Sequence, residues 1–241
     1  MTMTTMTTMT FSPMLRQLLD LLLPRHCGIC EERLNGNEDK ICISCLTTLI
    51  HPTLLDNVDN EVTRQLWGEV PIQAGVTLCY YLKDEDVKGL FHAMKYRGRV
   101  DTCVKMGQLL ASHFLPTGFF QDIDCIIPIP LSRQRQRKRG YNQSEHIAMG
   151  ISDLTGIPVD AATLIRIVDN ESQTHLSGID RRRNVENVFG VQAASDLNGK
   201  HLLIVDDIIT TGSTLSSAIA TLHRAFPQAT FSVASIAMTR R

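Results

Sequence analysis

Hydrophobic and polar residues follow two patterns along most of the chain. Short, nearly continuous apolar runs predict buried strands, and stretches with apolar residues on one helical face predict amphipathic helices. The runs predict strands at residues 76–82, 124–129, 163–167, 201–206 and 230–237, and helices at residues 83–95, 102–114, 144–155 and 213–226. Strands that alternate with helices are typical of a mostly parallel sheet covered on both faces. We therefore expect an α/β fold.

The first 70 residues do not share this alternation. Residues 1–13 are of low complexity, and we expect them to be disordered. We expect residues 14–70 to form a short helix, a compact cysteine module and a connector. We expect residues 71–241 to form the main domain. The leucines of residues 14–23 fit one helical face, but Asp20 interrupts the run. Because no run approaches the ~20 apolar residues of a membrane span, we expect neither a transmembrane segment nor a signal peptide.

Composition and charge narrow the class of protein. A chain of 241 residues can bury one substantial core plus a small module. The net charge of −1 argues against a generic nucleic-acid-binding protein, although a local basic patch stays possible. Seven unevenly spaced cysteines do not fit a secreted disulfide framework, so we expect a reducing compartment and a cytoplasmic protein.

Four of the cysteines form two close pairs. Cys27 and Cys30 make one C-x₂-C pair, and Cys42 and Cys45 make a second one. Two such pairs can place four thiolates tetrahedrally around zinc, which would make this a structural site. A redox pair and an iron–sulfur cluster are the alternatives. His26 is adjacent to the first pair but surplus to a set of four cysteines.

An unusual polar segment follows the strand predicted at residues 201–206. The strand delivers Asp206 and Asp207 to its carboxyl end, where ligands bind in open α/β sheets. Gly212 permits positive φ and a close approach of the backbone to a ligand. The next helix begins near Ser213, and we expect Ser213 or Thr214 near its N-cap. Its N-terminus and the hydroxyl groups of the segment offer donors to a phosphate, and the hydroxyl residues are Thr210, Thr211, Ser213 and Thr214.

The two acids beside this loop indicate what else the ligand carries. Ionised carboxylates accept strong hydrogen bonds from the vicinal hydroxyls of a sugar. The combination therefore predicts a cradle for a ribose 5-phosphate. It is not a Walker loop, because the lysine of that motif is missing. The alternative is a strand–turn–helix with polar caps.

Residues 130–142 are polar and basic, and we expect a loop there. Its positive side chains are Arg133, Arg135, Arg137, Lys138 and Arg139. Arginine forks match phosphate oxygens in bidentate fashion. Two alternatives remain, a solvated basic run and a surface for single-stranded DNA, on which Tyr141 could stack a base.

Several ordered motifs carry a family resemblance. The segment IVDDIITTGST is similar to the PRPP-binding motif of type I phosphoribosyltransferases. The segments Ile127–Gln143, Gln173–Phe189 and Met94–Gly98, with the four cysteines, resemble the ComF/GntX family. The resemblance implies a type I phosphoribosyltransferase fold, a zinc module, and PRPP bound with Mg²⁺ that ligand oxygens mainly hold. It also implies a link to DNA uptake in competent bacteria or to the use of DNA as a nutrient.

The resemblance also implies roles for individual segments. Asp206 and Asp207 would bind the ribose diol, the basic residues of 130–142 would form the pyrophosphate loop, and residues 169–187 would form a mobile lid that carries Arg181, Arg182, Arg183 and Asn184. Lys95 and Arg97 could also contact an anion. We assign neither a catalytic base, for which His175 is a weak candidate, nor an acceptor. The alternative function is a non-catalytic adaptor or single-stranded-DNA-binding protein of the uptake machinery, whose nucleotide pocket is regulatory or vestigial.

Overall fold

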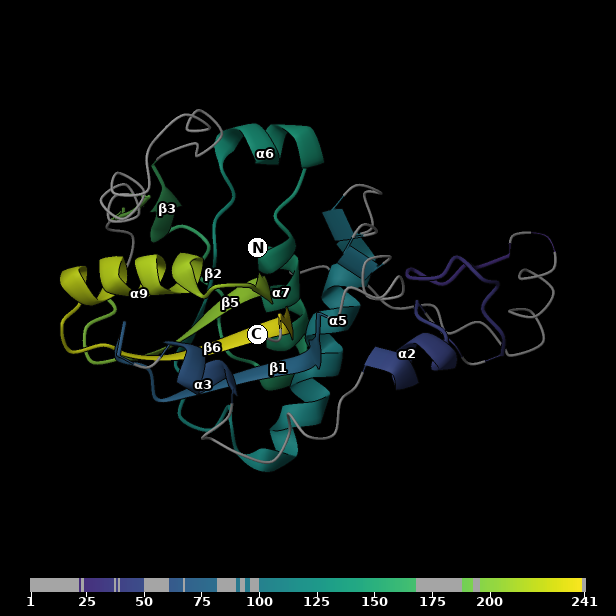
Figure 1. Ribbon diagram of the computed structural model, residues 1–241, viewed down its shortest axis with the longest axis horizontal. Coiled ribbons are helices and arrows are strands. Elements are labelled where there is room, and N and C mark those ends of the chain that lie inside the picture. Colours follow the sequence, from purple (N-terminus) through teal and green to yellow (C-terminus); the bar gives the residue numbers. More distant parts are fainter. Residues whose placement is uncertain are drawn as a thin grey trace, which may run out of the picture.

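A parallel sheet forms the centre of the molecule (Figure 1). The computed structural model describes residues 22, 24–36, 38, 40–49, 61–66, 68–81, 90–91, 94–95, 100–167, 188–192 and 196–239. Within them the sheet order is β1-β6-β5-β2, with β1 at Ala74–Tyr80, β2 at Cys125–Pro128, β5 at His201–Ile209 and β6 at Thr230–Met238. All three strand pairings are parallel, which confirms the predicted α/β class.

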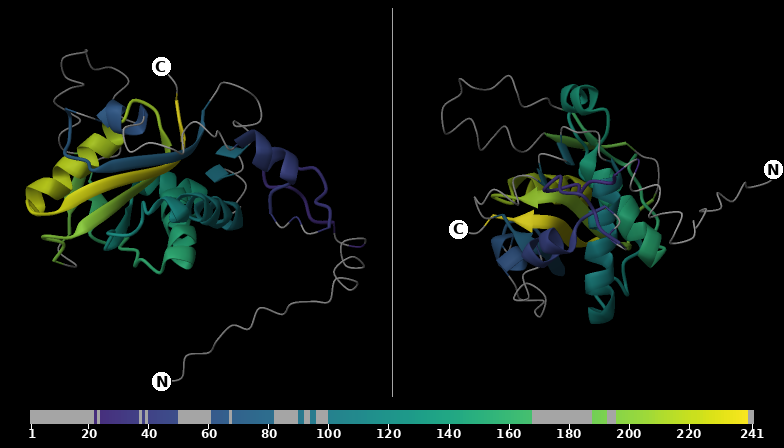
Figure 2. Two further views of the ribbon diagram at one scale, coloured as in Figure 1. Left: turned by 90° about the horizontal axis from the view of Figure 1, so that it is seen from below. Right: turned by 90° about the vertical axis from the view of Figure 1, so that its right-hand side faces the viewer.

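Helices cover both faces of this sheet (Figures 1 and 2). One face packs against α5 (Val100–Phe114) and α7 (Gln143–Thr155), and the other against α3 (Glu61–Leu66) and α9 (Ser213–Ala225). The remaining elements are α2 (Ile43–Leu49), a 3₁₀ turn at Leu115–Thr117, α6 (Arg133–Arg139), and a small antiparallel pair made of β3 (Leu164–Arg166) and β4 (Phe189–Val191).

Burial on both faces explains the apolar run that predicted β5. Leu203 and Val205 point into the core on the α5–α7 side, whereas Leu202 and Ile204 point into the core on the α9 side. Successive side chains of a strand alternate between faces, so a strand covered on both sides is apolar at every position.

Two glycines bring α5 and α7 into backbone contact. A Cβ atom at Gly107 would lie 2.1 Å from the carbonyl oxygen of Ile147, and one at Gly150 would lie 2.0 Å from that of Val104. No side chain fits into that space. The two helices are therefore locked together, and the N-terminus of α7 has a fixed place at the carboxyl edge of the sheet.

Two local predictions were wrong. Residues 130–142 are not all loop, because they contain α6, which Ser132 caps and Gly140 ends with φ of 81°. This helix buries none of its residues, so it leaves no apolar periodicity in the sequence. Strand β5 continues past the aspartates to Ile209, since it stays paired with β6. The N-cap of α9 is Gly212, so Ser213 and Thr214 lie directly after the cap, which agrees with their predicted place near it.

Several other predictions lie wholly or mostly outside the described residues. They are the disordered N-terminus, the helix at 14–23, most of the helix at 83–95, and the lid with Arg181, Arg182, Arg183 and Asn184. The domain boundary at residue 71 also stays a prediction. Within the part of the chain that the structure describes, no helix is both long and apolar enough to cross a bilayer.

Candidate functional site

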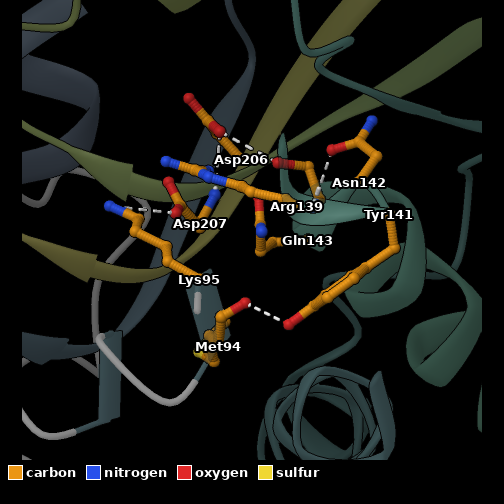
Figure 3. A network of polar contacts seen from close by, with 9 residues as sticks. Met94, Lys95, Arg139, Tyr141, Asn142, Gln143, Asp206 and Asp207 are labelled. Carbon is orange, nitrogen blue, oxygen red and sulfur yellow. Dashed lines mark hydrogen bonds and ion pairs between the residues drawn. The ribbon is translucent and has the colours of Figure 1, made fainter. Parts of the chain in front are cut away.

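The aspartate pair lies at the carboxyl end of β5 and is tied to two other elements (Figure 3). Asp206 Oδ1 accepts a hydrogen bond of 3.0 Å from Ser144 Oγ, at the start of α7, and one of 2.9 Å from the backbone N–H of Asp207. Asp207 Oδ2 lies 3.4 Å from Lys95 Nζ. Lys95 and Arg97 were both predicted as possible contacts for an anion. Lys95 lies at the aspartate pair, and Arg97 is outside the described residues.

Burial changes the protonation of Asp206. Removal from water raises the pKa of this carboxyl to about 7, and the nearby charge of Asp207 acts in the same direction. The hydrogen bonds from Asp207 N–H and Ser144 and the charge of Lys95 oppose this rise only in part. Asp206 therefore gains or loses its proton near neutral pH, so a hydroxyl donor or a cation that arrives here can change the charge of the pair.

The predicted phosphate loop follows directly after β5. Thr210, Thr211, Ser213 and Thr214 are exposed, and the hydroxyl oxygens of Thr211 and Ser213 lie 2.9 Å apart. Gly212 adopts φ of 83°, and no side chain of the N-cap residue occupies the N-terminus of α9. The loop thus presents hydroxyl groups beside a helix N-terminus, an arrangement suited to an anion.

Helix α3 packs against this loop and supports it. The sequence analysis did not predict this contact. A Cβ atom at Gly212 would lie 2.8 Å from Leu66 Cδ2, and the Gln65 side-chain amide donates to the carbonyl oxygen of Thr210. The region was interpreted only as part of a connector. The signal that could have revealed a short packed helix is the i, i+4 spacing of Val62 and Leu66, both of which are fully buried.

The segment between α6 and α7 fixes several groups around the aspartates. Asn142 caps α7 by accepting from Ser144 N, and its amide donates 3.0 Å to the carbonyl oxygen of Ile129. Gln143 Oε1 accepts a 2.9 Å hydrogen bond from an Arg139 Nη atom (Figure 3). Ser144 binds Asp206, as described above. Sequence reasoning used Asn142 and Gln143 only to support a resemblance, and Ser144 only as the start of a helix.

Tyr141 does not have the accessibility that base stacking requires. It is 8% exposed, and its hydroxyl donates a 2.6 Å hydrogen bond to the carbonyl oxygen of Met94. Burial, the largest cause, raises the pKa of the phenol to about 12. The suggestion that this ring stacks a nucleic-acid base was therefore wrong, since the ring packs against the core and secures the residue before Lys95.

The basic side chains of α6 fall into two groups. Arg133, Arg135, Arg137 and Lys138 are exposed, whereas Arg139 is half-buried at the end of the helix. Figure 3 shows the Arg139 side chain extending toward Asp206 and Asp207. One of the five predicted pyrophosphate-loop residues therefore points toward the predicted diol site.

The four cysteines of the N-terminal module meet in one cluster. Their sulfur atoms all lie within 4.8 Å of one another, with 3.7 Å between those of Cys30 and Cys42. Backbone N–H groups donate to Cys27 Sγ from Ile29 and Cys42, as they do to stabilise thiolates. The cluster could hold a metal ion such as zinc. None of the seven cysteines forms a disulfide bond.

The protonation of the cluster fits a cation. Burial disfavours the thiolate of Cys27, but the N–H groups of Cys42, Cys30 and Ile29 outweigh it and lower the pKa of Cys27 to about 7. Burial, followed by the neighbouring thiols of Cys42 and Cys30, raises the pKa of Cys45. Four crowded thiols cannot all ionise without a compensating positive charge, which a divalent ion supplies. The His26 ring bonds instead to the carbonyl oxygen of Glu31.

The module is docked on the first turn of α5. A Cβ atom at Gly28 would lie 2.6 Å from Thr102 Oγ1, and Lys40 forms a 3.0 Å ion pair with Asp101. Three of the cluster cysteines belong to the same hydrophobic core as α5 and β1. The cysteine module therefore packs as part of the main core.

Comparisons with known proteins identify the family of this chain. The phosphoribosyl transferase domain family matches residues 102–241. The chain is 30% identical over 205 residues to the DNA utilization protein YhgH of Salmonella typhimurium, covering 83% of this chain and 86% of the relative. It is 35% identical over 102 residues to competence protein F of Haemophilus influenzae, covering 42% of this chain and 44% of the relative. A solved glutamine PRPP amidotransferase from B. subtilis aligns with 62% of this chain and 28% of its own, at 18% identity and a TM-score of 0.38. The chain belongs to the ComF-like family of proteins with a type I phosphoribosyltransferase domain.

Proposed function

We propose that the protein binds PRPP, or a related ribose 5-phosphate, with Mg²⁺ and transfers the phosphoribosyl group to an acceptor. One observation carries the proposal: an aspartate pair and a hydroxyl-rich loop meet at the carboxyl edge of β5, at the N-terminus of α9. Carboxylates suit a diol, and the loop with the helix N-terminus suits a phosphate. A single sugar phosphate satisfies both.

The residues of the site divide the work of such a transfer. Asp206 and Asp207 accept hydrogen bonds from the two ribose hydroxyls, and residues 210–214 donate to the 5-phosphate. In the transfer, the C1–O bond to pyrophosphate breaks through an oxocarbenium-like transition state while a nucleophile of the acceptor bonds to C1. Positive groups stabilise the negative charge of the departing pyrophosphate. Lys95 pairs with Asp207, and the Arg139 side chain extends toward the aspartates, so both can approach the pyrophosphate. Magnesium, held mainly by ligand oxygens, would neutralise phosphate charge.

The names of the relatives suggest the context of the activity. One is called a DNA utilization protein and another a competence protein. We propose that this chain likewise serves the uptake or use of DNA, in the cytoplasm, where a reducing environment suits its seven free thiols. With Tyr141 buried, the described structure offers little to support single-stranded DNA as the main ligand.

Calorimetry with Mg–PRPP tests the ligand directly. Wild type should bind, and Asp207→Asn should bind about tenfold more weakly, because a hydrogen bond from the diol to a charged carboxylate contributes about 1.5–3 kcal/mol and one to a neutral amide oxygen about 0.5–1.5 kcal/mol. Asp122→Asn is the matched control, since Asp122 is exposed just before β2, at the opposite edge of the sheet. No heat from wild type would refute the proposal. Pyrophosphate release across a panel of acceptors would then separate an enzyme from a sensor.

We further propose that the metal of the cysteine cluster is zinc in a structural role. Four thiol ligands leave no open coordination position for a substrate. Elemental analysis of purified wild type should give about one zinc per chain, and Cys42→Ser should lose it. Cys79→Ser is the control, because Cys79 lies in β1 and a serine can still donate to the carbonyl oxygen of Ile236. Full zinc retention in Cys42→Ser would contradict the assignment.

A further inference from the structure

Arg139 differs from the other basic residues of α6 in what surrounds it. Its side chain is half-buried and extends toward Asp206 and Asp207, whereas the other four basic side chains of the helix are exposed. A guanidinium at this position can reach a pyrophosphate attached to a ribose that the aspartates hold. A long arginine side chain has many rotamers, however, so its placement needs a support.

Gln143 provides that support. Its side chain is 1% exposed, and its Oε1 accepts the 2.9 Å hydrogen bond from Arg139. Gln143 is the first residue of α7, directly between Asn142, which caps the helix, and Ser144, which binds Asp206. The arginine is therefore held by a helix terminus whose position is already fixed relative to the aspartates.

The other end of the same amide is not satisfied. Gln143 Nε2 is buried and has no hydrogen-bond partner among the described residues. A buried donor without an acceptor lowers stability, and an apolar side chain of similar length would avoid that cost. The Gln143 amide also lies close enough to the Tyr141 hydroxyl to act against the rise of its pKa, so the 2.9 Å contact with Arg139 is the clearest hydrogen bond that this side chain makes.

We propose that Gln143 is a positioning residue that holds the Arg139 guanidinium in place for the pyrophosphate group of the ligand. The inference rests on the proposed function, because it names the part of the ligand that this corner of the site recognises. Ribose 5-phosphate lacks the pyrophosphate. Gln143 therefore contributes to the binding of PRPP and not to the binding of ribose 5-phosphate.

Calorimetry with two ligands tests this selectivity. Gln143→Met should weaken binding of Mg–PRPP about tenfold, which is the low end for one charge-assisted hydrogen bond. The affinity for ribose 5-phosphate should stay within about twofold of wild type, and the melting temperature should not fall. Gln134→Met is the matched control, because Gln134 lies on α6 with its side chain exposed. Gln143→Leu replaces Gln143→Met if the latter does not fold.

A double-mutant cycle asks whether Gln143 acts through Arg139. In an Arg139→Ala background, Gln143→Met should change the PRPP affinity by less than about twofold, because nothing is left to position. Independent effects, unchanged PRPP binding, or an equal loss of both ligands would overturn the inference. Absence of binding to wild type by either ligand would instead refute the proposed function, so the two failures are distinguishable.

Discussion

The raised pKa of the Asp206 carboxyl predicts how the free energy of unfolding changes with pH. In the folded protein its pKa is raised from 3.8 to about 7, so between these values the folded state holds a proton that the unfolded chain has released. Stability must therefore fall as pH rises through this window. Asp206→Asn stays neutral at every pH, and its Oδ1 can keep the hydrogen bonds from Ser144 and from the backbone of Asp207.

The size of the effect follows from the pKa difference. At about 1.4 kcal/mol per pH unit, a rise from 3.8 to about 7 corresponds to about 4 kcal/mol above pH 7. The attraction of Lys95 is already part of this pKa, so we expect Asp206→Asn to be more stable than wild type by about 4 kcal/mol at pH 8. The gain should vanish near pH 4.

Urea denaturation of both proteins from pH 4 to pH 8 measures this difference, and other titrating groups cancel in the comparison. The same variant should bind Mg–PRPP more weakly, because the diol loses an ionised acceptor. The raised pKa of Asp206 would be refuted if the difference in unfolding free energy stayed constant across the pH range, or if the variant were less stable than wild type at pH 8.

Three further predictions concern packing around the site. Gly150→Ala should destabilise by more than about 3 kcal/mol, since its Cβ would lie 2.0 Å from the carbonyl oxygen of Val104, and thermal unfolding would detect it. Gly212→Ala should cost about 1–3 kcal/mol in urea and weaken PRPP binding, because φ is 83° and Leu66 fills the space. Tyr141→Phe should lose about 1 kcal/mol through its hydrogen bond to a main-chain carbonyl, yet leave any binding of single-stranded DNA measured by fluorescence anisotropy unchanged.

The predictable parts of the protein are those with a strong local pattern. Strand β5 is apolar on both faces, and the acids and Gly212 that follow it stand out against that pattern, so the carboxyl-end loop could be located from the sequence. The two C-x₂-C pairs likewise imply one cluster, and the structure brings all four sulfurs together. The roles of these residues in ligand binding stay predictions.

The parts that escaped prediction lack a local signal. Helix α6 buries nothing, so its formation depends on Ser132 at one end and Gly140 at the other. The contact by which Gln65 supports the predicted phosphate loop spans 145 residues of sequence. The contact of Ser144 with Asp206 spans 62 residues, and a serine at a helix start reads first as a capping residue. Such contacts between residues far apart in the sequence are set by how the strands and helices are arranged in the fold, so no local pattern predicts them.

The order of the strands in the sheet has a consequence for biosynthesis. Strand β1 is synthesised before the other three strands, but its neighbour in the sheet is β6. Ala74 therefore cannot pair until Ser232 has been synthesised. During synthesis on the ribosome, β1 and β5 would each present an open edge until residues 230–238 emerge. Open apolar edges invite wrong pairing, and such distant contacts form slowly. We therefore expect that chaperones must protect the nascent chain until β6 has been made. Helices α5 and α7 can pack against each other before that point.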